Sequence, residues 1–396
     1  MSSHLPWTRR GFLSALGAAG VVATSPQLRT AGCTEILDAV AGRPGADRRS
    51  LVLVGRSKTD GSGSGSIEIY DAEGSLWKAV GTPIATESPR GLTLHPNLPV
   101  LYVAHREAIH RNLPRGSVSA FVLDPRLKTL VQISREPLAL SATDPEHLSV
   151  APDARTLLVS ATGGGAYNFF ALAGDGALLP GPYALKQTGS GPHRLQASSR
   201  PHESVMHPGG SFAYSSDFGA DCIHQIGVAD GVPAVASRVY FKPGSGPSYL
   251  ALDPSGSLLI VSSLLKPSLS AVPIDAVTGH LHGAVHIYSL DLEAAGPLAI
   301  SRSGDRLYLA ATGLSGHTRV SVFQLSPTSG RLRLLHQAVV SSIRHPEQLL
   351  ILEDELLVSG VGGVARLSLD AGRGLVGEPM PVLHSSDSVS LALCAL

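Results

Sequence analysis

Short apolar stretches, separated by turn residues, recur along most of the chain in a fixed order. Each unit opens with a proline and two variable residues, continues with an apolar strand and a turn, and returns in a second apolar strand. Six prolines spaced 46 to 56 residues apart begin these units: Pro89, Pro145, Pro201, Pro247, Pro297 and Pro346. A third strand such as Ser117–Leu123 and a weaker fourth follow. Four strands per repeat of this length predict one blade of a β-propeller, and helical periodicity is absent after the N-terminal region.

The two ends of the repeat region fit together as one further blade. Leu51–Gly55 has the pattern of a second strand with no first strand before it, and Ser66–Tyr70 and Trp77–Val80 have the pattern of a third and a fourth. Ser388–Leu393 has the pattern of a first strand without a blade of its own. We therefore expect an all-β, seven-bladed β-propeller with four-stranded blades, in which the C-terminal strand completes the N-terminal blade and removes open sheet edges. Six or eight blades would follow if one weak strand were misassigned.

The first 41 residues have the pattern of a signal peptide and linker, which leaves residues 42–396 as a single propeller domain. The sequence T-R-R-G-F-L at residues 8–13 precedes an apolar stretch to Ala23 that is too short to span a membrane. This pattern is typical of a twin-arginine export signal and predicts a periplasmic or extracellular protein. An ordinary secretory signal and a lipoprotein site at Cys33 are the alternatives.

The composition narrows the function classes without selecting one. Lys and Arg total 31, Asp and Glu also total 31, and the 43 Gly and 28 Pro suit many tight turns. The chain has no basic stripe of the kind that binds nucleic acid, and no later stretch is apolar enough to span a membrane. Its three cysteines lack metal-site spacing. We expect a soluble monomer with no metal, no cofactor and no disulfide.

Residues just after each repeat proline should converge with residues that close the second strand. In a propeller blade the first strand is innermost and the second returns beside it, so both sets reach one mouth of the central channel. The first set contains Arg90, Glu146, His147, His202, Glu203, Ser248, Tyr249 and Glu347. The second contains His105, Arg106, Glu107, Thr162, Asp217, Leu264 and Thr312. Convergent ionisable groups at a mouth predict a small-molecule site, and hydrogen bonding between blades is the structural alternative.

The segment at residues 200–228 resembles the signature of lactonase-type propellers, which include bacterial 6-phosphogluconolactonases and fungal carboxymuconate cyclases. The second His of the family's P-H-x-H matches His202, and D-F-G-A-D beginning at Asp217 matches D-L-G-x-D. Gly246 and Pro247 match the start of the family's G-P-R-H. The resemblance covers about residues 50–396 and implies the same fold, with a hydrolase of carbohydrate metabolism as the implied activity.

Several positions depart from the family pattern. Arg200 replaces the first His of P-H-x-H, Ser248 and Tyr249 replace the Arg and His of G-P-R-H, Leu264 replaces the Glu of N-E-L, and Thr312 replaces the Arg of N-R-G. The resemblance implies that a His and a Glu act on the lactone ring and that arginines hold an anionic substrate. Ser and Thr cannot replace the charge of arginine, and Leu can neither donate nor accept a proton.

Two functions are therefore compatible with the sequence. In the first, a lactonase with a divergent site opens a small sugar-type lactone, and the lost arginines favour an unphosphorylated one. Its predicted catalytic residues are His202 as base, with Asp217 or Glu203 to orient it, and its predicted substrate-binding residues are Arg90, Arg106, His147, Arg200 and Tyr249. In the second, the propeller binds a ligand or a protein and catalyses nothing.

Overall fold

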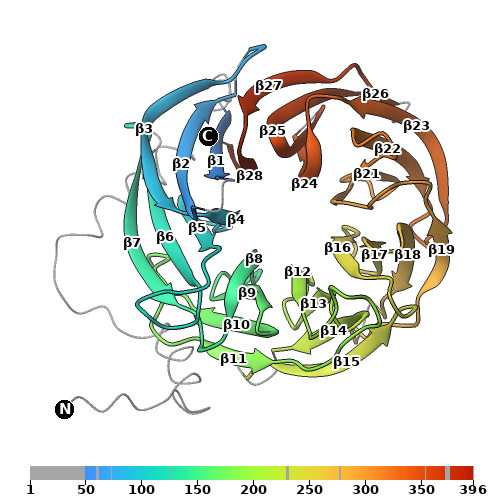
Figure 1. The fold of residues 1–396 in the computed structure, drawn as a ribbon, viewed down its shortest axis with the longest axis horizontal. Coiled ribbons are helices and arrows are strands. Elements are labelled where there is room, and N and C mark those ends of the chain that lie inside the picture. Colours follow the sequence, from blue (N-terminus) through green and yellow to red (C-terminus); the bar gives the residue numbers. More distant parts are fainter. Residues whose placement is uncertain are drawn as a thin grey trace.

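The computed structural model describes residues 50–58, 62–72, 74–124, 126–228, 232–275, 278–352, 354–370 and 375–395. These residues form seven antiparallel sheets, each of four strands, that stand around a common axis (Figure 1). The described part of the chain contains no helix, and so none that is long and apolar enough to cross a membrane. The predicted all-β, seven-bladed propeller is confirmed. The predicted signal segment lies outside the described residues and stays a prediction.

In each blade the strands follow one another outward from the axis, as the figure labels show (Figure 1). Blade 1 contains β28 (Ser388–Ala395), β1 (Ser50–Ser57), β2 (Ser64–Asp71) and β3 (Lys78–Glu87). Blade 2 contains β4 (Pro89–Leu94), β5 (Val100–His105), β6 (Ser117–Asp124) and β7 (Thr129–Pro137). Blade 3 contains β8 (Thr143–Val150), β9 (Thr156–Gly163), β10 (Ala166–Ala171) and β11 (Tyr183–Lys186). Blade 4 contains β12 (Pro201–Met206), β13 (Phe212–Asp217), β14 (Cys222–Gly227) and β15 (Ala234–Tyr240).

The remaining blades follow the same order. Blade 5 contains β16 (Pro247–Leu252), β17 (Leu258–Ser263), β18 (Ser268–Pro273) and β19 (Val285–Ser289). Blade 6 contains β20 (Leu298–Ile300), β21 (Arg306–Thr312), β22 (Thr318–Leu325) and β23 (Leu332–Val340). Blade 7 contains β24 (Arg344–Leu352), β25 (Glu355–Asp370) and β27 (Met380–Ser385), with β26 (Leu375–Val376) paired to the end of β25.

The two ends of the described chain meet in blade 1. Strand β28 pairs antiparallel with β1 in a continuous register that runs from Ser50 opposite Ala395 to Ser57 opposite Ser388. The C-terminal strand thus completes the N-terminal blade, as the sequence predicts. This pairing closes the ring, because it supplies the inner strand that the N-terminal segment lacks.

Apolar contacts between neighbouring blades form the core. Successive side chains of a strand point to opposite faces of its sheet, and each sheet has a neighbour on both faces. The described residues contain seven buried apolar clusters, one at each interface between blades. Tyr102 and Leu157 meet between blades 2 and 3, and Val52 and Leu357 meet between blades 7 and 1. Because each fully buried large apolar side chain contributes about 1.5–3 kcal/mol, these interfaces hold the inner strands in fixed positions.

Candidate active site

Five of the inner strands carry a β-bulge directly after the repeat proline. Because proline cannot donate a ladder hydrogen bond, regular pairing is interrupted there. The register with the neighbouring strand shifts between Pro89 and Gly91, Pro145 and His147, Pro201 and Ser204, Pro247 and Tyr249, and Pro346 and Gln348. A bulge re-aims side chains, so one feature of the repeat places a residue of each blade at the channel mouth. These residues are Arg90, Glu146, His202, Tyr249 and Glu347.

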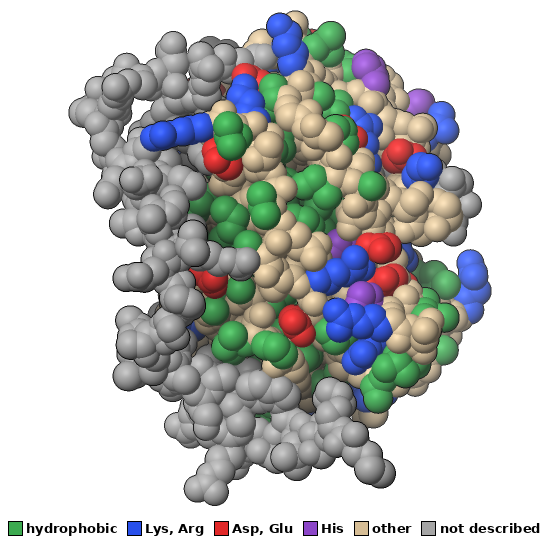
Figure 2. All heavy atoms as spheres, turned by 90° about the vertical axis from the view of Figure 1, so that its left-hand side faces the viewer, with side chains coloured by type: hydrophobic (Ala, Val, Ile, Leu, Met, Phe, Trp, Pro, Cys, Tyr) green, Lys and Arg blue, Asp and Glu red, His purple; other side chains and the backbone are tan. Residues whose placement is uncertain are grey.

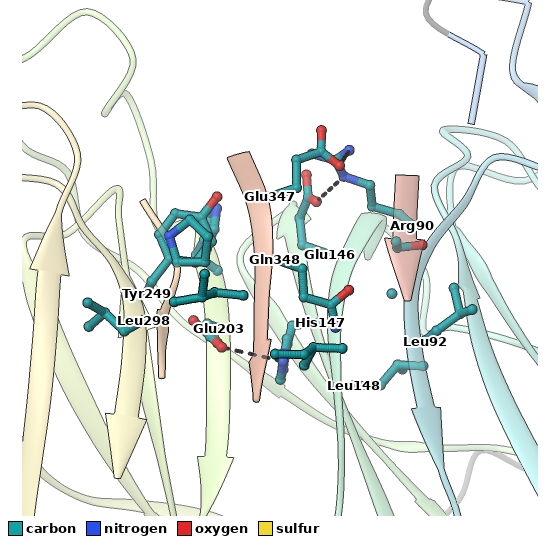
Figure 3. A pocket seen from close by; sticks show the side chains of 16 residues that line it. Arg90, Leu92, Glu146, His147, Leu148, Glu203, Tyr249, Leu298, Glu347 and Gln348 are labelled. Carbon is teal, nitrogen blue, oxygen red and sulfur yellow. Dashed lines mark hydrogen bonds and ion pairs between the residues drawn. The ribbon is translucent and has the colours of Figure 1, made fainter. Parts of the chain in front are cut away.

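The bulges border a cavity of about 260 Å³ whose lining comes from all seven blades (Figure 3). The lining residues are Arg90, Gly91, Leu92, Glu146, His147, Leu148, His202, Glu203, Tyr249, Pro297, Leu298, Glu347, Gln348, Leu349, Leu350 and Ser390. Five residues that the sequence predicts for the site are among them: Arg90, His147, His202, Glu203 and Tyr249. A concave site with several convergent polar groups is suited to a small molecule.

Arg90 is held between two carboxylates. Its Nε donates to Glu146 Oε2 at 3.0 Å, and its Nη1 lies 2.6 Å from Glu347 Oε2. Burial by itself would lower the pKa of the Arg90 guanidinium, but Glu347 and Glu146 outweigh burial and raise that pKa. Among the described residues that line the cavity, Arg90 is the only Lys or Arg. Its positive charge is therefore already matched by carboxylates of the protein.

Glu146 and Glu203 stand on neighbouring inner strands in opposite protonation states. Burial would raise the pKa of Glu146, but Arg90 and Arg106 outweigh burial and lower that pKa, so Glu146 is a carboxylate. Burial raises the pKa of Glu203 to about 8, although Glu203 Oε2 accepts a hydrogen bond from the backbone N–H of Leu250 at 2.8 Å. At neutral pH Glu203 is mostly a carboxylic acid, able to donate a hydrogen bond, whereas Glu146 can only accept one.

Two histidines accompany these carboxyl groups. Burial, together with the nearby His202, lowers the pKa of His147 to about 4, and its Nε2 lies 3.6 Å from Glu203 Oε1 (Figure 3). Burial also lowers the pKa of His202, and Glu146 opposes this shift. Both imidazoles are therefore neutral near pH 7. The Nδ1 atom of His202 is buried and has no hydrogen-bond partner among the described residues. Since a buried polar atom without a partner is costly, this nitrogen is poised for a bound molecule.

The opposite side of the cavity offers fewer polar groups. The Tyr249 ring meets the His202 ring edge to face, with 4.9 Å between the centroids, and burial raises the pKa of the Tyr249 hydroxyl. In blade 6 the residue after the repeat proline is Leu298, at the start of the short strand β20. Blade 6 therefore contributes Pro297 and Leu298 to the lining and no ionisable group.

Asp217, predicted to orient His202, does not line the cavity. Its Oδ1 accepts hydrogen bonds from the backbone N–H groups of Arg200 at 2.7 Å and of Gly219 and Ala220 at 3.0 Å, and its Oδ2 accepts one from the Ser199 hydroxyl at 2.5 Å. A Cβ on Gly219 would lie 1.8 Å from a backbone carbonyl oxygen, so the turn requires glycine there. The D-F-G-A-D sequence thus orders a loop, and Asp217 belongs to that loop rather than to the cavity.

The predicted positive charges of Arg106 and Arg200 also lie outside the lining. Arg106 is 43% exposed, and its Nη2 and Nε lie 3.5 Å from Glu146 Oε1 and 3.9 Å from Asp144 Oδ1. The Arg200 guanidinium lies over the Phe218 ring, 5.8 Å from its centroid, in a cation–π contact. Arg106 therefore acts on the cavity through Glu146, and Arg200 packs against the loop that follows Asp217.

Residues that close the second strands connect blades and linkers instead of lining the cavity. The buried His105 ring bonds through Nδ1 to the Glu87 carbonyl at 2.9 Å and through Nε2 to the Ser119 hydroxyl at 2.8 Å. The Thr162 hydroxyl donates to the Asp144 carbonyl at 3.0 Å. Leu264 and Thr312, the positions where the family's Glu and Arg are replaced, likewise lie outside the lining. For His105 and Thr162 the alternative of a structural role in hydrogen bonding therefore fits better than a role in ligand binding.

A charged network anchors the loop between β5 and β6. Figure 2 shows Lys and Arg side chains gathered with acidic and His side chains toward one edge of the face that carries blades 1 and 2. The Arg135 guanidinium binds Glu87 at 2.7 Å and Glu107 at 3.2 Å, and Glu107 also lies 3.0 Å from His110 Nδ1. Burial would raise the pKa of Glu87, but Arg135 outweighs burial and lowers it. This network fixes the base of the loop and, through it, Arg106.

One group of side chains has the composition of a metal site. Ligand atoms of Asp217, Cys222 and His224 lie within 4.8 Å of one another, and all three residues are buried. Each already has partners, because His224 Nδ1 bonds to the Tyr167 hydroxyl at 2.8 Å and His224 Nε2 lies 3.3 Å from Cys222 Sγ. Burial raises the pKa of the Cys222 thiol to about 12, so the thiolate that a metal would need is disfavoured. The group is best described as a buried hydrogen-bond network.

A family model described as "Lactonase, 7-bladed beta-propeller" matches residues 51–360. The chain belongs to this lactonase family. Its fold is similar to that of the Pseudomonas aeruginosa periplasmic gluconolactonase PpgL, with a TM-score of 0.76 and 23% identity over 87% of this chain and 99% of that one. A 6-phosphogluconolactonase candidate from Bacteroides fragilis gives a TM-score of 0.75 and 20% identity, covering 88% of this chain and 99% of that one. The protein YwcC of Lactococcus lactis is 26% identical over 156 residues, which are 38% of this chain and 45% of YwcC, so the match spans less than half of that relative.

The cavity also contains residues to which the sequence assigned no role. Glu146 and Glu347 were placed at the mouth, and the structure shows that both bind Arg90. Leu298 and Gln348 were not singled out. All four lie within two residues of a repeat proline, so the repeat itself carried the signal. What the pattern lacked was the local strand geometry: blade 5 brings the second residue after the proline, Tyr249, to the cavity, and Leu298 reaches it from a strand without a bulge.

Proposed function

We propose that this propeller hydrolyses a small, unphosphorylated lactone in the cavity at the channel mouth. The observation that carries this proposal is the convergence of Glu146, Glu203 and His202 in one cavity, where His202 Nδ1 is buried and has no hydrogen-bond partner among the described residues. Burial raises the pKa of Glu203 and lowers that of His202, whereas Arg90 and Arg106 lower the pKa of Glu146. Paired groups whose environments push their pKa values apart are typical of acid–base catalysis. Family membership and the names of the similar structures agree with lactone hydrolysis as the reaction.

In the proposed reaction His202 acts as the general base. Its Nδ1 takes a proton from water, and the resulting hydroxide attacks the carbonyl carbon of the lactone. The protonated carboxyl of Glu203 donates a hydrogen bond to the oxyanion that forms, and Glu146 stabilises the imidazolium of His202 electrostatically. The bond from the carbonyl carbon to the ring oxygen then breaks, and the imidazolium returns its proton to that oxygen. The products are one hydroxy acid and the free enzyme.

The charge balance of the cavity favours a substrate without a phosphate. Arg90, the one Lys or Arg among the described lining residues, already binds Glu146 and Glu347, and Arg106 outside the lining also lies 3.5 Å from Glu146. A phosphate dianion placed here would face these carboxylates without a free bidentate partner. Neutral lactones meet no such repulsion.

Proton release from a panel of lactones tests this proposal. The chain from residue 42 should turn over δ-valerolactone or glucono-δ-lactone well above the spontaneous rate, and 6-phosphogluconolactone at least about tenfold more slowly, as the repulsion of a buried like charge implies. Absence of turnover on every lactone by a folded sample would overturn the enzyme proposal and leave the cavity as a ligand-binding site. Preference for the phosphorylated lactone would overturn the substrate assignment alone.

The exported location is proposed on the sequence alone. The T-R-R-G-F-L segment supports twin-arginine export to the periplasm or beyond. Fractionation of cells that express the full chain should recover the protein outside the cytoplasm, and the double substitution Arg9→Lys with Arg10→Lys should retain it inside. Equal export of both forms would favour an ordinary secretory signal.

A further inference from the structure

The two sides of the cavity differ in their ionisable groups, although each also contributes leucine to the lining: Leu92 and Leu148 on one side and Leu298 on the other. Arg90 and Glu146 lie on one side, and Tyr249 and Leu298 lie on the other (Figure 3). The first side belongs to blades 2 and 3, the second to blades 5 and 6. Every lining residue from blades 5 and 6 is Tyr249, Pro297 or Leu298. This second group is called the apolar wall below.

We infer that the substrate is a lactone that carries an apolar substituent, such as a short alkyl chain, on the side that meets the apolar wall. This inference rests on the proposed function, because it orients the lactone group toward His202 and Glu203. The ring of Tyr249 joins the two parts of the site, since its edge-to-face contact with His202 sets the wall directly beside the proposed base.

The apolar wall discriminates against a polyhydroxy lactone. Hydroxyl groups that face Pro297 and Leu298 would lose hydrogen bonds to water and find no side-chain donor or acceptor in those two residues. Leu298 is 9% exposed, pairs with Leu309 and belongs to the buried apolar cluster between blades 5 and 6, so that core supports the wall. A wall with such support cannot easily move aside to admit water.

The same wall favours an alkyl group in the same place. Each methylene moved from water to an apolar surface changes an equilibrium or rate ratio by about threefold. The cavity has a volume of about 260 Å³, so kcat/KM should increase with chain length only while the substituent still fits beside the lactone ring. We therefore expect kcat/KM to rise with chain length and then to level off or fall.

The experiment compares kcat/KM for δ-valerolactone, its 6-methyl, 6-ethyl and 6-propyl derivatives, and glucono-δ-lactone. We expect about a threefold rise per added carbon, so that the 6-propyl lactone exceeds δ-valerolactone by roughly 30-fold and also exceeds glucono-δ-lactone. The substitution Leu298→Asn should abolish the dependence of kcat/KM on chain length. Leu264→Asn, at a rim position outside the cavity lining, is the matched control and should keep the dependence.

A binding measurement separates this inference from the proposed function. The corresponding lactams, piperidin-2-one and its 6-propyl derivative, keep the ring and carbonyl and resist hydrolysis. Titration calorimetry should give tighter binding of the 6-propyl lactam to the wild-type chain. Turnover without a chain-length effect would overturn the inference and leave the proposed function standing. Chain-dependent lactam binding without lactone turnover would overturn the proposed function and keep the ligand class. If the wild-type chain shows neither lactone turnover nor chain-dependent lactam binding, the proposed function and the inference are both overturned.

Discussion

Blades 2 to 4 and blades 5 and 6 are built by the same repeat, yet they contribute different types of side chain to the mouth of the channel. After the repeat prolines, blades 2, 3 and 4 place Arg90, Glu146 and His202 in the cavity lining, and blade 6 places Leu298 there. The strand pattern behind these residues is the same, with an inner strand, a return strand and a buried apolar cluster on each face. The comparison teaches that the repeat fixes where a side chain emerges, while the residue at that one position decides the chemistry.

The largest effect should come from removing the proposed base on the polar side. His202→Ala should lower kcat/KM for a lactone by about 10²- to 10⁴-fold, because among the described lining residues only His202 has an imidazole nitrogen that is both buried and without a hydrogen-bond partner. Steady-state kinetics measure the loss, and circular dichroism checks the fold. His207→Ala, just beyond the far end of the same strand β12, is the matched control. A loss of similar size in the control would refute the assignment.

The next effect concerns stability on the polar side. Arg90→Ala should lower the free energy of unfolding at pH 7 by about 3 kcal/mol, because it leaves Glu146 and Glu347 close together without their cation. Since Arg90 helps to hold the pKa of Glu146 low, this stabilisation is present at neutral pH and is lost as the pH falls below the ordinary carboxyl range.

Urea denaturation of the Arg90→Ala variant at several pH values measures this loss of unfolding free energy. The exposed Arg126→Ala is the control and should change the unfolding free energy by less than about 0.5 kcal/mol. A loss for Arg90→Ala that is the same at pH 4 and pH 7 would show that packing, rather than charge, accounts for it.

A smaller, pH-dependent effect should distinguish the two carboxyl groups. Because burial raises the pKa of Glu203 to about 8, activity that needs its proton should fall roughly tenfold between pH 7 and pH 9. Glu203→Gln keeps a neutral donor and should remove this alkaline limb. The folded state also holds this proton more tightly than the unfolded chain, so stability should decline as the pH rises through about 8. Hydrolysis rates corrected for the spontaneous reaction measure the pH dependence of activity, and thermal melts measure that of stability. If the alkaline limb is unchanged in Glu203→Gln, Glu203 is not its source.

The smallest effect should appear at the positions where the family residues were replaced on blades 5 and 6. Leu264→Ala and Thr312→Ala should each change kcat/KM by less than about twofold, because neither side chain lines the cavity. Michaelis–Menten measurements on the lactone turned over best would check this. A tenfold loss at either position would mean that the substrate extends over the rim of blades 5 and 6. These two blades would then contribute more to substrate binding than the cavity lining indicates.

The sequence predicted much of the site because the site follows the repeat. Counting two residues beyond each repeat proline reaches His147, His202, Glu203 and Tyr249, all of which line the cavity. Asp217 was predicted from its place at the end of a second strand and from a family signature, and in this chain its carboxylate orders a loop. A motif that orders the backbone and a motif that supplies chemistry look alike in a sequence, since both preserve a few polar residues at fixed spacing.

The sequence by itself determined the blades, their number, and the joining of the two ends in one sheet. These properties follow from alternation, turn residues and repeat length, which are local along the chain. Only the tertiary structure decided that Arg90 binds Glu146 and Glu347, that burial raises the pKa of Glu203, and that Leu298 lines the same cavity as His202. Those outcomes depend on distances between residues up to about 260 positions apart (from Arg90 to Glu347), and on how deeply each pair is buried. Burial and proximity set charge states, and neither can be read from the order of residues alone.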